Sequence, residues 1–443
     1  MRQSLRNPAR IVPLAFLSAI AVGTALLLLP ISRNGDDSAP FVEAIFTATS
    51  GVCVTGLTVV DVSTYWSGFG QLVLICLVQI GGFGIMTLAS LLSLAVAGRL
   101  GLRERLAAQV ETKGIDLGNI RNVVLRVAVV VFIVESVAAV VLSLRFYLGY
   151  GYEFGTAVWH GIFHAVSAFN SAGFALHTDS LETFIHDPVV TVPVAVAALI
   201  GGIGFPVIVE LVRRTFRPSK WTLHTKITLM GSAVLLAVGF ATYLVVEWDN
   251  AHTLGPMTLL ERVHAASFSA VMPRSAGYNI LPIPDLKPET WAITDVLMFI
   301  GGGSAGTAGG IKVSTFFVLA FVIWAELRGE PDVSMFGRTI PAAAQRSALT
   351  VALLGVGCVA VGTIALMAVS NLPFDVLLFD ATSAFGTVGL SSGATGALND
   401  SGHLILVALM FTGRVGTVTL GAALALRARH RRFRFPDSRP IIG

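Results

Sequence analysis

The chain has 443 residues, of which 54% are hydrophobic and only 13% are charged, whereas about 25% of the residues in an average soluble protein are charged. This composition excludes an ordinary soluble enzyme and indicates a membrane protein. The net charge of +4 also occurs in nucleic-acid-binding proteins, so the positions of the positive residues decide what it means.

Apolar runs of about 20 residues, long enough to cross a bilayer as a helix, occur eight times. They cover residues 11–29, 69–97, 123–146, 189–212, 227–246, 291–324, 349–369 and 404–426. An even number of spans places both termini on the same side of the membrane.

Positive residues gather on the side of the termini, which holds 23 of the 30 lysines and arginines. By the positive-inside rule that side is cytoplasmic. The opposite loops are acidic and include Asp61, Asp179 and Glu182. The basic surplus therefore reflects topology, and we expect a multi-pass protein of the cell membrane with both termini in the cytoplasm and no nucleic-acid partner.

Four segments between paired spans resemble one another and are too short and too polar to cross the membrane. They read PFVEAIFTATSGVCVTGL, AVWHGIFHAVSAFNSAGF, LERVHAASFSAVMPRSAGY and PFDVLLFDATSAFGTVGL. Each has a glycine before its last residue, and the four are Gly56, Gly173, Gly277 and Gly389, at intervals of 117, 104 and 112 residues. This period predicts four repeats on one chain.

A second glycine confirms the period, because it follows the first by 25, 28, 24 and 24 residues, at Gly81, Gly201, Gly301 and Gly413. The repeating unit is a span, a re-entrant segment and a second span. We place the four units at residues 1–112, 113–221, 222–338 and 339–443, the last with a basic cytoplasmic tail. The predicted fold is all-α and integral to the membrane, with eight transmembrane helices and four half-helices around one central pore.

The re-entrant segments contain about 11 residues with helical spacing, enough for a helix of about 16 Å, or half a bilayer. The three residues that end at each glycine are then non-helical at membrane depth, which is tolerated where backbone lines a water-filled path. Their carbonyls would replace the hydration shell of a cation, and the helix dipoles would favour positive charge there. The predicted selectivity filter comprises Val54, Thr55, Gly56, Ser171, Ala172, Gly173, Ser275, Ala276, Gly277, Thr387, Val388 and Gly389.

Helix packing and dinucleotide binding are alternative roles for these glycines. Packing is the usual role of a membrane glycine, but packing alone does not account for four in register after amphipathic half-helices. The strings GGFG and GGIG lie inside apolar spans, with no strand before them and no ribose-binding acid at the required distance, so a dinucleotide site is rejected.

The four-repeat plan and the strings VTGL, NSAGF, GTVGL and GGIKVSTF resemble the Trk/Ktr/HKT superfamily of potassium uptake proteins, most closely its KtrB group of bacterial membrane subunits. The resemblance covers practically the whole chain. It implies potassium uptake through one pore per chain, potassium bound at the filter, homodimeric assembly, and control by a cytosolic KtrA-like RCK ring that would carry the regulatory nucleotide. A sodium-selective relative is the alternative within the superfamily, but its pattern replaces the first filter glycine with serine, and Gly56 argues against that.

The sixth span is interrupted by the glycine-rich run at 301–310, which cannot sustain a regular helix. The resemblance assigns this segment the role of a flexible intramembrane gate below the filter, and a bend that only packs is the alternative. Its glycine content, and Thr417 where the related pattern often carries proline, are departures that concern gating. The candidate gate residues are Gly301, Gly302, Gly303, Ser304, Ala305, Gly306, Thr307, Ala308, Gly309, Gly310, Lys312 and Arg414.

Arg414 falls near the middle of the last span, where an unpaired charge costs at least ~2.5 kcal/mol. Either it forms an ion pair with a carboxylate such as Glu135, or it is a positive charge below the filter that limits leakage. Lys312 either anchors the end of the gate or extends its ammonium group towards water.

The remaining polar residues indicate no catalytic or metal site. Cys53, Cys76 and Cys358 lie far apart in apolar runs, so we expect core residues rather than a disulfide or zinc site. His160, His164 and His264 show no ligand spacing and are expected to be polar lining or core residues. A membrane enzyme would need nucleophile, base or metal clusters at the water interface, and the sequence contains none. Clustered cytoplasmic arginines fit both an acidic soluble partner and anionic lipid headgroups.

Overall fold

The computed structural model describes residues 8–35, 37–97, 120–214, 217–274 and 276–416. Regular structure in this part is helical apart from one small antiparallel hairpin, β1 (Ser334–Met335) with β2 (Arg338–Thr339). The predicted all-α class is confirmed.

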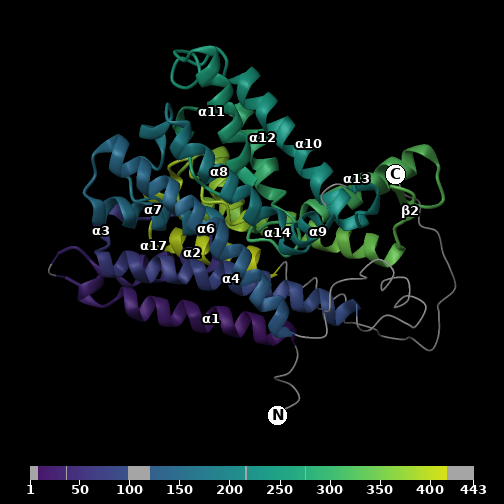
Figure 1. Ribbon diagram of the computed structural model, residues 1–443, viewed down its shortest axis with the longest axis horizontal. Helices are drawn as coiled ribbons and strands as arrows, with labels where there is room; N and C mark the ends of the chain where they lie inside the picture. The colour runs from purple at the N-terminus through teal and green to yellow at the C-terminus, as the bar shows by residue number, and fades with distance from the viewer. Residues whose placement is uncertain (1–7, 36, 98–119, 215–216, 275, 417–443) are drawn as a thin grey trace, which may run out of the picture.

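Long and intermediate helices make up most of the molecule (Figure 1). They are α1 (Pro8–Leu27), α4 (Gly68–Ala97), α6 (Ile120–Tyr150), α8 (Pro188–Ile203), α9 (Phe205–Arg214), α10 (Leu223–Val246), α12 (Pro288–Phe299), α13 (Val313–Arg328), α14 (Ala342–Val369) and α17 (Asp400–Phe411), which continues into a π-helix at Thr412–Gly416. Short helices and 3-10 turns lie at Pro30–Ser32, α3 (Val62–Tyr65), Glu182–Phe184, Pro218–Lys220, Met272–Arg274, Ile283–Asp285 and α16 (Ala394–Ala397).

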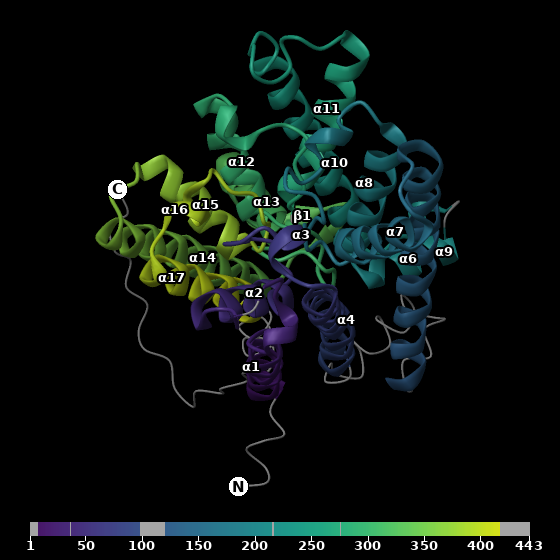
Figure 2. The same ribbon diagram turned by 90° about the vertical axis from the view of Figure 1, so that its left-hand side faces the viewer.

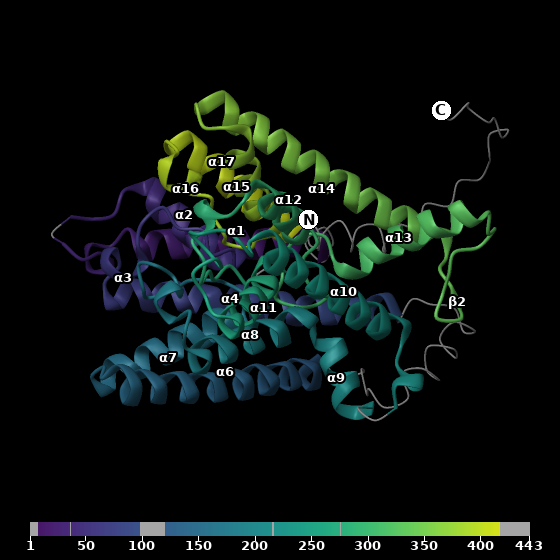
Figure 3. The same ribbon diagram turned by 90° about the horizontal axis from the view of Figure 1, so that it is seen from above.

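Four further helices coincide with the predicted half-helices: α2 (Phe41–Cys53), α7 (Phe154–Phe169), α11 (Leu259–Val271) and α15 (Phe374–Gly386). They pack between longer helices: α2 against α1 and α4, α7 against α6 and α8, α11 against α10 and α8, and α15 against α14 and α17. Figure 2 and Figure 3 show the long helices α6 and α14 on opposite sides of the molecule, with half-helices between them. This arrangement buries the half-helices and leaves the long helices outside.

Among the described residues, four helices are individually long and apolar enough to cross a membrane: α4, α6, α10 and α14. The bent pair of α8 and α9 makes a fifth if it is one span. The other predicted spans do not coincide with a single long helix in the described residues. The described apolar part of α1 covers residues 12–27, the span predicted at 291–324 is divided between α12 and α13, and the last predicted span extends past the described residues.

The span predicted at 189–212 is divided into two helices, because α8 and α9 meet at an angle of 100°. Gly204 lies at the bend with a φ of 101°, a conformation that residues with a side chain rarely adopt. A methyl group on Gly204 would lie 2.4 Å from the carbonyl oxygen of Ser304. The bend thus makes room for the segment that follows α12.

The outer faces of the long helices expose large apolar side chains, as expected for contact with lipid. Phe132 on α6 is 72% exposed and Val361 on α14 is 69% exposed. The cysteines do not all lie in the core as predicted: Cys53 is buried, Cys358 is half-buried, and Cys76 is exposed on α4. In a membrane protein, an apolar run in the sequence is compatible with a lipid-facing surface as well as with a core, so the sequence does not decide where such a cysteine lies.

Candidate functional site

After three of the four half-helices, the residue two positions before the glycine has a left-handed conformation although it is not a glycine. Val54, Ser171 and Thr387 have φ values of 56°, 61° and 48°, in the left-handed region that usually requires glycine. Strain of this kind, about 1–3 kcal/mol per residue, is typical of functional sites. The same backbone hydrogen bond follows each of them: from Thr55 to Ser50 at 2.8 Å, from Ala172 to Ser167 at 2.8 Å, and from Val388 to Ser383 at 2.9 Å.

A serine six residues before the glycine fastens the non-helical segment back onto its half-helix. Ser50 accepts a hydrogen bond from the Gly56 nitrogen at 3.1 Å and donates to the Leu57 carbonyl at 2.8 Å. Ser383 accepts from Gly389 at 3.1 Å, and Ser167 donates to Phe174 at 3.0 Å. These serines were missed in the sequence, although the shared letter six positions before three of the glycines was a visible signal.

The four glycine segments meet in a closed ring. Each glycine lies against the carbonyl oxygen just before the next glycine, so close that a methyl group would overlap it. The methyl carbon would lie 1.9 Å from the Ala172 oxygen if placed on Gly56, and 2.7 Å from the Ala276 oxygen if placed on Gly173. On Gly277 it would lie 2.2 Å from the Val388 oxygen, and on Gly389 it would lie 2.4 Å from the Thr55 oxygen. The four φ values, 89°, 73°, 65° and 101°, are all positive, so both space and backbone conformation favour glycine here.

The third segment is built differently from the other three. Val271 replaces the serine, and a 3-10 turn, Met272–Arg274, follows α11. The Tyr278 hydroxyl, which is buried, donates to the Phe174 carbonyl at 2.9 Å and so joins the third segment to the second. Ser275, one of the predicted filter residues, lies outside the described residues.

A cavity of about 240 Å³ opens above the ring, and all four glycines line it. Asp61, Asp179 and Glu182 also line this cavity and make it attractive to cations. Burial, followed by the charge of Asp179, raises the pKa of Glu182. We call this space the outer cavity.

A buried carboxylate on the fourth half-helix holds the wall of the outer cavity. Asp380, fully buried on α15, accepts hydrogen bonds from three residues of the loop after Gly389. The donors are the Ser391 hydroxyl at 2.8 Å, the Ser392 nitrogen and hydroxyl at 2.8 and 2.9 Å, and the Thr395 nitrogen and hydroxyl at 2.7 and 2.6 Å. The loop is thereby fixed to the half-helix that precedes the glycine.

The predicted gate lies between α12 and α13 as a non-helical loop, here called the 301–310 loop. Its backbone bonds to the end of α8 and to the turn that follows: Gly303 donates to Gly202 at 2.8 Å, Thr307 donates to Gly201 at 3.1 Å, and Phe205 donates to Ala305 at 3.3 Å. The loop also closes on itself, since Gly301 donates to Ile311 at 2.9 Å and Ile311 to Phe299 at 3.1 Å. Most of it, including Ala305, Gly306 and Gly310, is buried.

The 301–310 loop contacts two filter segments directly. The Thr307 and Ser171 hydroxyls lie 2.8 Å apart, and a methyl group on Gly309 would lie 2.0 Å from the Thr387 hydroxyl oxygen. Residues predicted as gate and as filter therefore touch, and none of the 301–310 loop lines the outer cavity.

Both cations of the predicted gate bind the loop's backbone. Arg414, 1% exposed in the π-helix, donates from Nη1 to the Thr307 carbonyl. Its Nε and Nη2 atoms have no hydrogen-bond partner within the described residues. Lys312 donates to the Ala308 carbonyl and, at 3.4 Å, to that of Gly309. Lys312 thus anchors the loop end.

Glu135 binds residues other than Arg414, so the ion pair that was one of two hypotheses for this arginine does not form. The Glu135 carboxylate accepts hydrogen bonds from Asn170 at 3.1 Å and from Gln79 at 3.4 Å. Asn170 also donates to the Gln79 amide oxygen at 2.7 Å. This network links α4 and α6 to the residue that precedes the second filter segment.

Comparison with known proteins gives consistent results. The TrkH family pattern, described as "Cation transport protein", matches residues 5–428. Ktr system potassium uptake protein B of Bacillus subtilis (strain 168) is 37% identical over 437 residues, covering 99% of this chain and 97% of that protein. The Potassium/sodium uptake protein NtpJ of Enterococcus hirae is 32% identical over 443 residues, covering 99% of this chain and 97% of that protein.

The fold is also similar to a solved structure. The crystal structure of the potassium transporter TrkH from Vibrio parahaemolyticus matches with a TM-score of 0.72 at 19% sequence identity, over 95% of this chain and 85% of that one.

The role of Asp380 can be tested by Asp380→Asn. Replacing one carboxylate oxygen by an amide donor leaves buried donors of the loop unpaired, which we expect to destabilise the protein by about 2–4 kcal/mol. The melting temperature of the detergent-solubilised protein measures this. Asp375→Asn, an exposed carboxylate on the same helix, is the control and should change it little; equal melting temperatures for both variants would contradict the assignment.

Proposed function

This chain belongs to the TrkH family of cation transport proteins, and we propose that it is the potassium-conducting membrane subunit of a Ktr-type uptake system. It is a multi-pass membrane transport protein and not an enzyme. Potassium as the cargo is inferred from the names of its relatives and from the geometry of the glycine ring.

The observation that carries the proposal is the closed ring of four glycines beneath one cavity. Four corresponding segments around one axis would form a single pore within one chain, built from four repeats of span, half-helix and span. The filter would comprise the three residues that end at each glycine. Cations would enter from the outer cavity, where Asp61, Asp179 and Glu182 raise their local concentration.

Selectivity would come from backbone carbonyls, which replace water around a dehydrated ion. The half-helices end at the ring, so the negative ends of their dipoles favour a cation there. The ring has no room for side chains at the four glycines, which keeps the carbonyls as the groups available to the ion.

The 301–310 loop would act as the gate, because it bonds to the filter from below and is held by few side chains. Thr307 contacts the second filter segment, and Arg414 holds Thr307 through its carbonyl. The arginine also adds a positive charge below the filter, which opposes the passage of a cation.

Sodium conduction is the second candidate, favoured by the name of the Enterococcus relative, a potassium/sodium uptake protein. Gly56 in the first filter segment supports potassium, because the sodium-selective members of the superfamily that the sequence resembles have serine at this position. The two candidates are separated by measuring the relative uptake of the two ions.

Assembly and orientation complete the proposal. Both termini would lie in the cytoplasm by the positive-inside rule, and the chain would form a homodimer that docks on a cytosolic RCK-type ring. The ring would carry the nucleotide, while lipid headgroups contact the arginines at the membrane surface.

Replacing Gly56 by serine tests the filter. The new side chain would collide with the Ala172 carbonyl and distort the ring, so we expect the preference for potassium over sodium to fall about tenfold, equivalent to about 1.4 kcal/mol. Rubidium and sodium uptake into liposomes measures it. Gly84→Ser is the matched control, because a side chain there meets no atom within 4 Å; unchanged preference in a folded Gly56→Ser variant would refute the filter.

Replacing Arg414 by alanine tests the gate. The change removes a bond to the 301–310 loop and a repulsive charge, so we expect potassium flux to rise severalfold and to depend less on the regulator. Deletion within residues 301–310 should act in the same direction, whereas Arg414→Lys, which keeps the charge, should stay near the parent. If both the alanine variant and the deletion conduct like the parent, the loop is structural.

Charge reversal tests the docking of the ring. Arg103 with Arg105, and Arg431 with Arg432, lie outside the described residues but in connections predicted to be cytoplasmic. Reversing both clusters should weaken co-purification with the cytosolic subunit and leave membrane insertion intact. If binding persists with both clusters reversed, the ring docks elsewhere and the arginines serve topology or lipid binding.

A further inference from the structure

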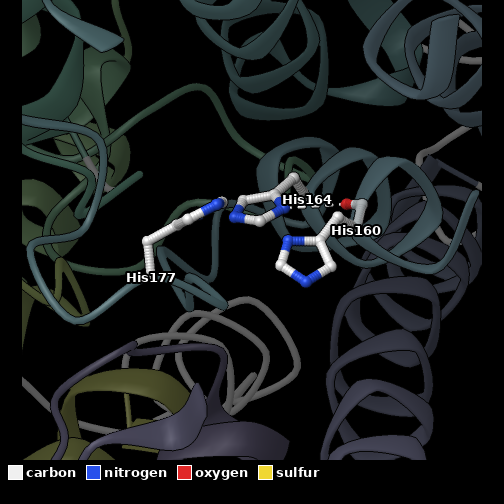
Figure 4. A group of neighbouring side chains, drawn as sticks. All are labelled: His160, His164 and His177. Carbon is white, nitrogen blue, oxygen red and sulfur yellow. Dashed lines mark hydrogen bonds between the residues drawn. The ribbon is translucent and has the colours of Figure 1, made fainter. Parts of the chain in front are cut away.

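Three histidines meet beside the outer cavity, and two of them are four positions apart on one helix, a spacing that helical metal ligands share. His160 and His164 lie one turn apart on α7, and His177 comes from the loop after Gly173; one ring nitrogen of each lies within 4.8 Å of those of the other two. Figure 4 shows the three rings converging from these two segments. His264, grouped with the first two by sequence, lies apart and contacts the Thr191 hydroxyl at 2.9 Å.

Existing hydrogen bonds prepare His164 as a ligand. Its Nδ1 lies 2.7 Å from the His160 carbonyl, to which it must donate. In the neutral ring the other nitrogen, Nε2, is then unprotonated and accepts a hydrogen bond from the Leu176 nitrogen at 3.3 Å, which a metal ion bound at Nε2 would replace. A bond from one ring nitrogen to a backbone carbonyl is the arrangement that commonly orients a metal-binding histidine.

The other two histidines each carry a buried nitrogen that needs a partner. Nδ1 of His160 and Nδ1 of His177 are buried and have no hydrogen-bond partner within the described part of the chain. Leaving a buried polar atom unpaired costs about 1–3 kcal/mol. Burial, with a smaller effect of His160, lowers the pKa of His177 to about 4, so this ring is neutral at physiological pH.

We propose that His160, His164 and His177 bind a divalent transition-metal ion, zinc, from the extracellular side. Imidazole nitrogens suit zinc, and three protein ligands with an open fourth position form a common zinc geometry. His177 lines the outer cavity, which gives the ion a route of entry and a water molecule access to the fourth position. Nitrogens about 2.0–2.1 Å from zinc lie about 3.4 Å apart, so binding requires the distances between the ring nitrogens, at most 4.8 Å, to shorten by up to about 1.4 Å.

The alternative is that the three rings only pack. Phe146 and Phe184 surround them, with Phe184 4.9 Å from His177 between ring centres, and such an aromatic cluster needs no metal. Packing explains the burial of the rings but leaves both Nδ1 atoms unpaired. Metal binding accounts both for the convergence of the three rings and for the unpaired Nδ1 atoms of His160 and His177.

Zinc at this site would oppose cation transport. It would place two positive charges beside the entrance and tie the loop after Gly173 to α7. We therefore expect micromolar extracellular zinc to slow potassium uptake. This effect depends on the proposed function, whereas zinc binding does not, so the two are tested separately.

The binding experiment uses the full-length protein with a histidine-free affinity tag, cleared of metal by a chelator and titrated with zinc chloride in a calorimeter. We expect one zinc ion per chain with a Kd in the micromolar range or below. His160→Ala and His177→Ala should each weaken binding at least tenfold. His264→Ala, which removes a histidine from another half-helix, should leave it unchanged.

A conservative variant and a direct measurement protect the test from misfolding. His177→Cys supplies a thiolate ligand and should retain zinc binding, and X-ray absorption of the zinc-loaded parent should report three nitrogen neighbours. The proposal is overturned if the parent binds no zinc, if the double alanine variant binds it as tightly as the parent, or if the absorption spectrum lacks three nitrogen neighbours. Zinc binding without inhibition of uptake would keep the site and refute its effect on transport.

Discussion

The contact on which the rest of the structure depends is the approach of four backbone segments to one another without side chains between them. A carbonyl lies where the Cβ of each neighbouring glycine would be. Such non-helical backbone is stable at membrane depth only if the surrounding protein bonds its polar groups. The half-helices supply part of that surrounding, because the carbonyls of Ser50, Ser167 and Ser383 accept hydrogen bonds from the segments that follow them.

Burying the half-helices creates a need for polar side chains in an apolar protein. Near the ring, backbone groups are bonded by the serine side chains of Ser50, Ser167 and Ser383. In the loop beyond the ring, they are bonded by the carboxylate of Asp380. Glu247 has a similar role at the C-terminal end of α10, where it accepts hydrogen bonds from Asn250, Thr253, Thr290 and the Lys287 nitrogen. Few charged residues are available in this composition, and the buried ones organise loops.

The 301–310 loop follows the same rule with weaker restraints. Its backbone groups bond to Gly201 and Gly202 at the end of α8, so the bend at Gly204 and the break after α12 belong to one arrangement. Arg414 and Lys312 hold carbonyls of the loop from outside. The loop is thus held by hydrogen bonds and by glycine contacts, without a large side chain of its own.

The sequence by itself determined the elements whose signals are local: the apolar runs, the four half-helices, the positions of the four glycines and the break in the sixth span. It did not determine the bend at Gly204, the exposure of Cys76, the separation of Arg414 from Glu135, or the meeting of His177 with His160. Those features depend on how separate segments pack, as does the contact between Thr307 and Ser171, which are 136 positions apart. Periodicity reports which face of one helix is apolar, and only tertiary packing decides which neighbour, or which lipid, that face meets.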